Sequence, residues 1–227
     1  WITDRRMPWV LGFFLSLAIL TKLSGLVIAP VVYIQLAWRA WLHGSWRDFL
    51  TSVTIVTVTI AACTGWWFWR NYSLYGDVLA THTMIAPGVV RAETASVADL
   101  VREAPGWWLS FWGVFGAFNI LSANWTYVFY TLLTVISFVG MVMWAWRARY
   151  GKVLDASAPQ CFAFLFVCFS LAGGLYWARG LYASQGRLVL GAIAPISAFI
   201  AAGILGLFER RWRTPVSMLV SAGLFIV

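Results

Sequence analysis

The chain has 227 residues, of which 62% are hydrophobic and only 11% are charged, and its formal net charge is +8. A soluble domain carries roughly a quarter charged residues, so this composition excludes an ordinary soluble enzyme or binding module. The basic residues stand at the ends of apolar runs and form no stripe on a polar face, which argues against nucleic acid as a partner. The expected partner is the lipid bilayer.

Several apolar runs reach the ~20 residues that a helix needs to cross a bilayer. The sequence therefore predicts an all-α, polytopic integral membrane bundle, with residues 1–227 in one transmembrane domain. The first run, 9–38, contains Lys22, whose charge is costly at the centre of a membrane helix. We expect two short helices there, with Lys22 near their turn. About six to seven membrane helices are predicted, over residues 8–20, 25–41, 50–69, 125–146, 160–178, 188–208 and 215–227.

A long polar connection, about 70–124, separates the third and fourth predicted helices. It follows a dense group of tryptophans at 66, 67 and 69, and such density marks a bilayer–water interface. Within it, the segment 107–120 is amphipathic enough to lie in the interface, with its tryptophans as membrane anchors or as surfaces on which a sugar stacks. His82 has no second histidine nearby in this connection, which argues against a metal site there.

The basic residues orient the chain. Placing four basic connections in the cytoplasm satisfies the positive-inside rule. Alternation then puts 70–124 and the short connection 179–187 outside a cytoplasmic membrane that the chain crosses several times. The residues that set this orientation are Arg5, Arg6, Arg39, Arg47, Arg147, Arg149, Lys152, Arg210, Arg211 and Arg213.

Three basic residues break the bias, because Lys22, Arg179 and Arg187 fall near the predicted outer side in short connections. One interpretation is that their long side chains reach to the lipid headgroups. The other is that they form a cluster that grips an anionic headgroup at the outer leaflet.

Three segments then line up on the predicted outer side: LAILTKLSGLVIAP (17–30), GWWFWRNYSLYGD (65–77) with SFWGVFGAFN (110–119) downstream, and SQGRLVLGAIAP (184–195). In this order they resemble the middle and C-terminal part of GT-C type membrane glycosyltransferases, and most closely the bacterial relatives of protein mannosyltransferases and aminoarabinose transferases. The resemblance implies a GT-C-like fold and transfer of a sugar from a polyprenyl-phosphate donor to an acceptor, not identified, at the outer face of the membrane.

The same resemblance implies a site for the donor phosphate. Arg187 is the first candidate ligand, because it follows Gly186 and opens a late span, and arginine's planar fork suits a phosphate. Lys22 and Arg70 are the second and third candidates, although Lys22 also fits a helix end and Arg70 an interfacial anchor. Further possible substrate contacts are Gln185, Tyr182 and Asp77, the last of which also fits a turn.

The family places its key acidic residues in a first outer loop, and nothing in this sequence resembles that loop. The chain does not begin with Met and ends in an apolar run, so we expect an internal segment of a longer protein, with the catalytic acidic residues outside it. No cofactor is evident, and a divalent metal, although possible for the family, has no support in the residues. Two other functions stay open: a non-catalytic GT-C-like protein of cell-envelope polysaccharides, and a transporter or flippase of lipid-linked sugars.

Overall fold

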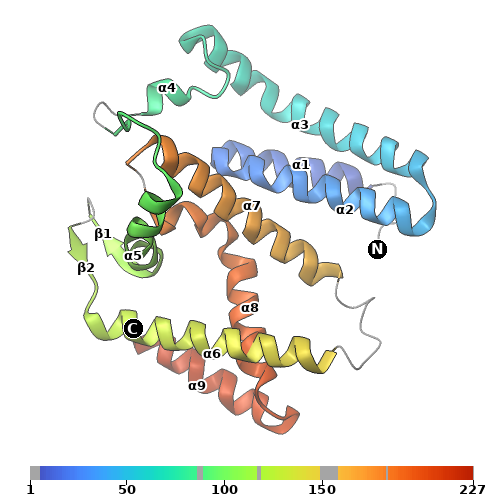
Figure 1. Cartoon of the computed structure of the whole chain (residues 1–227). Helices are drawn as coiled ribbons and strands as arrows, with labels where there is room; N and C mark the ends of the chain where they lie inside the picture. Colours follow the sequence, from blue (N-terminus) through green and yellow to red (C-terminus); the bar gives the residue numbers. More distant parts are fainter. Residues whose placement is uncertain (1–5, 86–88, 117–118, 149–157, 183, 227) are drawn as a thin grey trace. The chain divides into compact units, whose positions relative to one another are not determined.

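The computed structural model of the chain describes residues 6–85, 89–116, 119–148, 158–182 and 184–226 (Figure 1). The chain forms two compact units, each built from two stretches that are distant in sequence. The first unit comprises Trp1–Leu100 with Cys168–Ala183, and the second comprises Val101–Val167 with Ser184–Val227.

Three helices form the core of the first unit: α1 (Met7–Thr21), α2 (Ile28–His43) and α3 (Trp46–Tyr75). The α3 helix packs against both α1 and α2. Their contact is a core of four buried side chains, Leu15, Ile19, Leu36 and Val56. In a bilayer the surrounding lipid is as apolar as these side chains, so close packing between helices holds such a core together.

The break predicted near Lys22 is present between α1 and α2. Lys22 has an extended backbone, with φ −158° and ψ 134°, and a 3₁₀ turn, η1 (Leu23–Val27), follows before α2 begins. Pro30 stands in the first turn of α2, where its missing amide hydrogen costs no helical hydrogen bond. The break removes Lys22 from the middle of a membrane helix, as its charge requires.

The α3 helix is longer than expected, with 30 residues in place of the predicted 50–69. It ends at Gly76, which adopts the left-handed conformation (φ 66°) and donates its amide to the carbonyl of Tyr72 at 2.9 Å. The polar connection therefore begins after Tyr75, and Arg70 lies inside the helix rather than at the start of the connection. The turn after Gly76 leads to a short helix, α4 (Thr81–Met84).

The described part of the predicted interfacial segment 107–120 falls into two kinds of secondary structure. Its first half is the end of α5 (Val97–Gly113), and its second half enters a two-stranded antiparallel hairpin, β1 (Val114–Phe115) with β2 (Ile120–Leu121). The side chain of Tyr127 holds the hairpin, because its hydroxyl donates to the carbonyl of Gly113 at 2.5 Å and accepts from the amide of Ser122 at 3.0 Å.

The second unit is built on the crossing of α6 (Asn124–Ala148) and α8 (Ile193–Gly206). The backbones meet at Gly140 and Gly203, where a β-carbon on Gly203 would stand only 2.2 Å from the carbonyl oxygen of Ser137. The Ser137 hydroxyl also donates to the carbonyl of Ile200 at 3.0 Å. Small residues that allow close backbone approach are typical of helix contacts in membranes.

The remaining elements are α7 (Ala158–Gly180), the 3₁₀ turns η2 (Gly186–Ala192) and η3 (Arg210–Trp212), and α9 (Arg213–Ile226). Among the described residues, five helices are long and apolar enough to cross a membrane: Leu23–His43, Trp46–Tyr75, Asn124–Met143, Pro159–Gly180 and Gly186–Gly206. The α1 helix is apolar but shorter.

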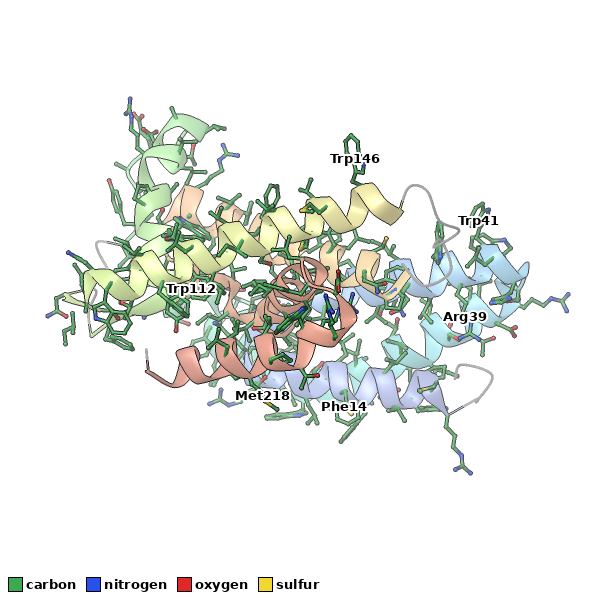
Figure 2. All side chains as sticks on the ribbon, turned by 90° about the horizontal axis from the view of Figure 1, so that it is seen from below. Phe14, Arg39, Trp41, Trp112, Trp146 and Met218 are labelled. Atoms are coloured by element: carbon green, nitrogen blue, oxygen red, sulfur yellow. The ribbon has the colours of Figure 1, made fainter. Side chains whose placement is uncertain are left out.

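Large apolar side chains cover the outside of these helices. Figure 2 labels four that are exposed, Phe14, Trp41, Trp146 and Met218. A soluble protein does not expose apolar surface on this scale, whereas a bilayer requires it. The helices and their surface together identify an all-α, multi-pass membrane protein.

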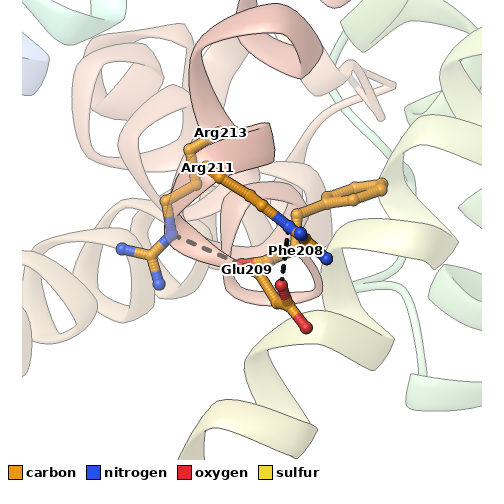
Figure 3. Close-up of polar contacts among 4 residues, drawn as sticks. All are labelled: Phe208, Glu209, Arg211 and Arg213. Atoms are coloured by element: carbon orange, nitrogen blue, oxygen red, sulfur yellow. Dashed lines mark hydrogen bonds and ion pairs between the residues drawn. The ribbon is translucent and has the colours of Figure 1, made fainter.

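The basic turn after α8 is ordered by local polar contacts (Figure 3). Arg211 Nε lies 2.9 Å from a carboxylate oxygen of Glu209, and Arg213 Nε donates to the carbonyl of Phe208 at 3.4 Å. Both ion-pair side chains are about three-quarters exposed, so this pair adds little stability. Its charges remain accessible to water and headgroups, as the positive-inside assignment needs.

This assignment predicts a labelling pattern. In a chain whose native cysteines are replaced, Glu93→Cys is expected to react with a membrane-impermeant maleimide in intact cells, whereas Arg211→Cys is expected to react only after the membrane is opened. Both positions are exposed, so their difference reports the side of the membrane. The reverse pattern would invert the orientation and remove the basis for an outer-face site.

Candidate functional site

The turn 184–187, at the start of the span Gly186–Gly206, holds the first predicted phosphate ligand. Gln185 is extended, with φ −127° and ψ 119°, and the 3₁₀ turn η2 begins directly after it. Arg187 Nε donates to Gln185 Oε1 at 2.6 Å, and the Arg187 side chain is exposed. The structure thus brings together Arg187 and Gln185, an arginine and an amide at the end of a membrane helix.

Gly186 pins this turn to α5. Its amide donates to Ser110 Oγ at 2.8 Å, and that hydroxyl in turn donates to the carbonyl of Gly106 at 2.6 Å. A β-carbon on Gly186 would stand 2.2 Å from the carbonyl oxygen of Trp107 and 2.6 Å from Cβ of Phe111, so only glycine fits. The close approach of Gly186 to α5 therefore fixes the position of the Arg187 backbone.

Glu103 lies one helical turn away on the same face of α5, and sequence reasoning missed it. The hydroxyl of Ser184 donates to its carboxylate oxygen Oε2. Glu103, Trp107 and Ser110 are spaced by four and three residues, which places them in one row along a helix. Ser184 bonds to Glu103 and Gly186 bonds to Ser110, so both ends of this row are joined to the turn that carries Arg187.

The tryptophans of α5 mostly hold the helix in place. Trp108 Nε1 donates to Thr131 Oγ1 at 3.0 Å, and the ring of Trp112 stacks on Tyr130 with centroids 4.3 Å apart and planes 8° from parallel. Tyr130 therefore covers one face of Trp112 that a sugar would need for stacking. These contacts attach α5 to α6. They therefore also hold the turn 184–187, which is bonded to α5 through Ser110.

Tyr182, predicted as a possible substrate contact, lies against Arg91. Its ring lies under the guanidinium of Arg91, 4.6 Å from Cζ to the centroid, and Arg91 Nε donates to the carbonyls of Ala178 and Leu181, both at 3.0 Å. Arg91 thereby satisfies carbonyls at the C-terminal end of α7 and places a positive charge at the negative end of the helix dipole.

The backbone beside Arg91 joins two connections. Val90 and Leu181 form an antiparallel bridge, the amide of Ala95 donates to the backbone carbonyl of Arg179 at 2.9 Å, and the amide of Tyr182 donates to the backbone carbonyl of Val89 at 2.7 Å. The long connection after α3 and the end of α7 therefore lie on the same side of the membrane. The alternation of spans predicted this arrangement.

Asp77 orders the turn after α3. Its carboxylate accepts the amides of Leu79 and Thr81 at 3.0 and 2.7 Å, and the Thr81 hydroxyl at 2.9 Å. These contacts form an Asx turn that leads into α4, which is the structural alternative to a substrate contact.

Lys22 and Arg70 are both exposed in the first unit, Lys22 between α1 and η1 and Arg70 inside α3. In the described part of the chain, no hydrogen bond or ion pair joins either side chain to another residue. Because Arg187 belongs to the second unit, a three-cation cluster stays a prediction. The side chain of His82 lies outside the described residues, and among those described no three His, Cys, Asp or Glu side chains gather as metal ligands.

The second unit also contains an apolar cavity of about 310 Å³. It is lined by α8 from Ile193 to Leu205, by Trp112 and Tyr130, and by Ser217, Val220 and Ser221 of α9. Since η2 runs directly into α8, the cavity begins next to the end of the 3₁₀ turn that carries Arg187. Such a space accepts a chain of apolar atoms rather than a charged group.

Comparisons of the chain with protein families, with curated proteins and with solved structures found no match.

Proposed function

We propose that this chain belongs to a GT-C type glycosyltransferase of the cytoplasmic membrane, which transfers a sugar from a polyprenyl-phosphate donor to an acceptor at the outer face. The observation that carries the proposal is the exposed Arg187, bonded to Gln185 at the start of a membrane span and set by a glycine that tolerates no side chain. The ordered motifs that resemble this enzyme class support it.

Sugar transfer from a lipid phosphate requires a cationic side chain beside that phosphate. When the acceptor oxygen attacks the anomeric carbon, the lipid phosphate leaves and its negative charge grows in the transition state. An arginine beside it stabilises that charge through two parallel N–H donors. Gln185 orients the guanidinium and supplies an amide that is able to donate to a phosphate or sugar oxygen.

The apolar cavity along α8 supports the lipid part of the donor. A polyprenyl tail consists of branched apolar units and fits a groove lined mainly by apolar side chains. With the phosphate at Arg187, a tail that followed α8 inward would meet the cavity lined by Ile193, Trp112 and Tyr130.

The test is a transfer assay in right-side-out membrane vesicles that contain or lack the full chain. Each preparation receives polyprenyl-phosphate donors carrying tritiated mannose, glucose or aminoarabinose, and the label that leaves the lipid is measured. The proposal predicts chain-dependent loss of label from at least one donor. If no donor loses its sugar faster with the chain than without it, the chain is a non-catalytic protein or a transporter.

One observation favours the transporter as a second candidate. Two spans begin in the same way, with an extended residue and a 3₁₀ turn before an α-helix whose third residue is proline: Lys22 with η1, and Gln185 with η2. Paired irregular helices occur in transporters, although there they lie near mid-membrane. Chain-dependent movement of a fluorescent polyprenyl phosphate between leaflets of proteoliposomes, without loss of sugar, would favour this candidate.

A further inference from the structure

Ser110 is a buried serine of α5 that is bonded to the turn 184–187, and its side chain is 7% exposed. Its hydroxyl donates to the carbonyl of Gly106 at 2.6 Å, within its own helix, and accepts the amide of Gly186 at 2.8 Å. A serine hydroxyl has one proton to donate and two lone pairs that accept. Because the helix engages the proton, a lone pair is directed at the turn, and α5 sets that direction.

The amide of Gly186 depends on this hydroxyl. Gly186 is buried and opens the 3₁₀ turn η2, and the first amides of a helical segment have no carbonyl partner within it. A buried amide that loses its acceptor is costly. Without the hydroxyl, the turn is expected to shift toward another partner, and Arg187, the next residue, shifts with it.

The α5 helix contacts the proposed donor site at a second point. Two residues after Ser110, Trp112 forms part of the wall of the apolar cavity, where its ring stacks on Tyr130. Through Ser110 the helix holds the turn that carries Arg187, and through Trp112 it contributes to the space proposed for the lipid tail. The hydrogen bond from Gly186 to Ser110 therefore sets the spacing between the two.

We propose that Ser110 is a positioning residue for the donor phosphate, which holds Arg187 in register with the apolar cavity. The assignment rests on the function proposed above. Ser110 is buried and acts through Gly186 and the backbone that carries Arg187. A ligand group held in place before the lipid arrives loses less conformational freedom on binding, and a small displacement of it weakens the contact. Phosphate binding then depends on a hydroxyl that the phosphate does not contact.

The test compares Ser110→Ala with the wild-type full chain in phosphatidylcholine nanodiscs. Each receives undecaprenyl phosphate or undecaprenol, which differ only in the phosphate, and native mass spectrometry counts the lipid retained. Ser110→Ala is expected to lower the preference for undecaprenyl phosphate about 3- to 10-fold and to retain undecaprenol within about twofold of wild type, as for one lost hydrogen bond at the phosphate site. A purely structural role would lower the retention of both lipids equally, and that result would overturn the assignment.

Ser137→Ala is the matched control. Ser137 is a serine of the same unit that is 1% exposed, and its hydroxyl donates to the carbonyl of Ile200 at 3.0 Å. That bond joins α6 to α8 rather than α5 to the turn 184–187. The lipid preference of Ser137→Ala is expected to stay within about twofold of wild type, because separate sites act nearly independently. A loss of preference equal to that of Ser110→Ala would make the effect a general one of buried hydroxyls.

A double variant tests whether Ser110 acts through Arg187. In an Arg187→Ala chain the phosphate ligand is already absent, so the addition of Ser110→Ala is expected to cause no further loss of undecaprenyl phosphate. The apolar tail still binds in this background, which leaves retention that is able to fall. A further loss of about threefold or more would show that Ser110 affects the lipid by another route, and the assignment would be wrong.

The outcomes also separate this assignment from the proposed function. If wild type prefers undecaprenyl phosphate and Ser110→Ala keeps that preference in full, Ser110 only anchors the turn to α5 and the phosphate site at Arg187 stands. If wild type retains both lipids equally, the phosphate site fails and the assignment of Ser110 fails with it.

Discussion

Replacing Arg187 by alanine is expected to lower the rate of sugar transfer about 30- to 1,000-fold. The side chain is exposed at the start of a membrane span, where a charge-assisted contact to a leaving phosphate is strong. Losing one such contact costs on the order of 2–4 kcal/mol of transition-state stabilisation. The vesicle assay measures the loss, with the amount of inserted protein determined for each variant.

Two variants sharpen this prediction. Arg187→Lys is expected to recover only part of the rate, because lysine keeps the charge but lacks the planar fork. Arg211→Ala removes an exposed arginine of the basic turn after α8 and is expected to retain transfer close to wild type. Transfer by Arg187→Ala at near wild-type rate would reduce Arg187 to an interfacial anchor.

Replacing Gly203 by alanine is expected to destabilise the second unit. The added β-carbon would stand 2.2 Å from the carbonyl oxygen of Ser137 and 2.5 Å from its hydroxyl oxygen. Because the obstacle is backbone, no change of side-chain rotamer relieves it and α8 must move away from α6. Overpacking of this kind costs about 1–3 kcal/mol, which lowers the Tm by roughly 2–12 °C in a chain of this size.

The measurement is thermal unfolding of the purified chain in detergent, followed by the fluorescence of its tryptophans. Gly65→Ala in α3 is the matched control, since a β-carbon there meets nothing within 4 Å. An α-helical glycine in open space is expected to gain about 0.5–1 kcal/mol on replacement by alanine. Equal effects at the two positions would show that α6 and α8 do not cross at Gly203.

Hydropathy and charge predicted most of the membrane helices, because apolar length and the cost of a buried cation are local properties of the sequence. The break at Lys22 followed from that cost alone. The end of α3 was not predicted. The helix continues past the tryptophans to its cap at Gly76, and hydropathy does not indicate where a helix with polar residues ends. The hairpin in the second half of the segment 107–120 was not predicted, because Tyr127, a residue outside the segment, holds it.

The candidate site was predictable only in part. Arg187 and Gln185 are neighbours in sequence, so their contact was within reach of motif reasoning. Glu103 and Ser184 are far apart in the chain, and nothing local to either residue indicates their hydrogen bond. Tyr182 and Asp77 both carry polar groups that fit a substrate contact. In the structure, the ring of Tyr182 lies under Arg91, which donates to the carbonyl of Ala178, and the carboxylate of Asp77 accepts the amide of Thr81. Such competition for partners is decided by tertiary structure.

The measurement that tests the central claim most directly is lipid retention by the full chain, since it requires neither the sugar nor the acceptor to be known. Wild type and Arg187→Ala are placed in phosphatidylcholine nanodiscs with undecaprenyl phosphate or undecaprenol, and native mass spectrometry counts the prenyl lipids retained. We predict that wild type retains undecaprenyl phosphate in preference to undecaprenol, and that Arg187→Ala loses this preference. Equal retention of both lipids by wild type, or an unchanged preference in Arg187→Ala, would contradict a phosphate site at Arg187.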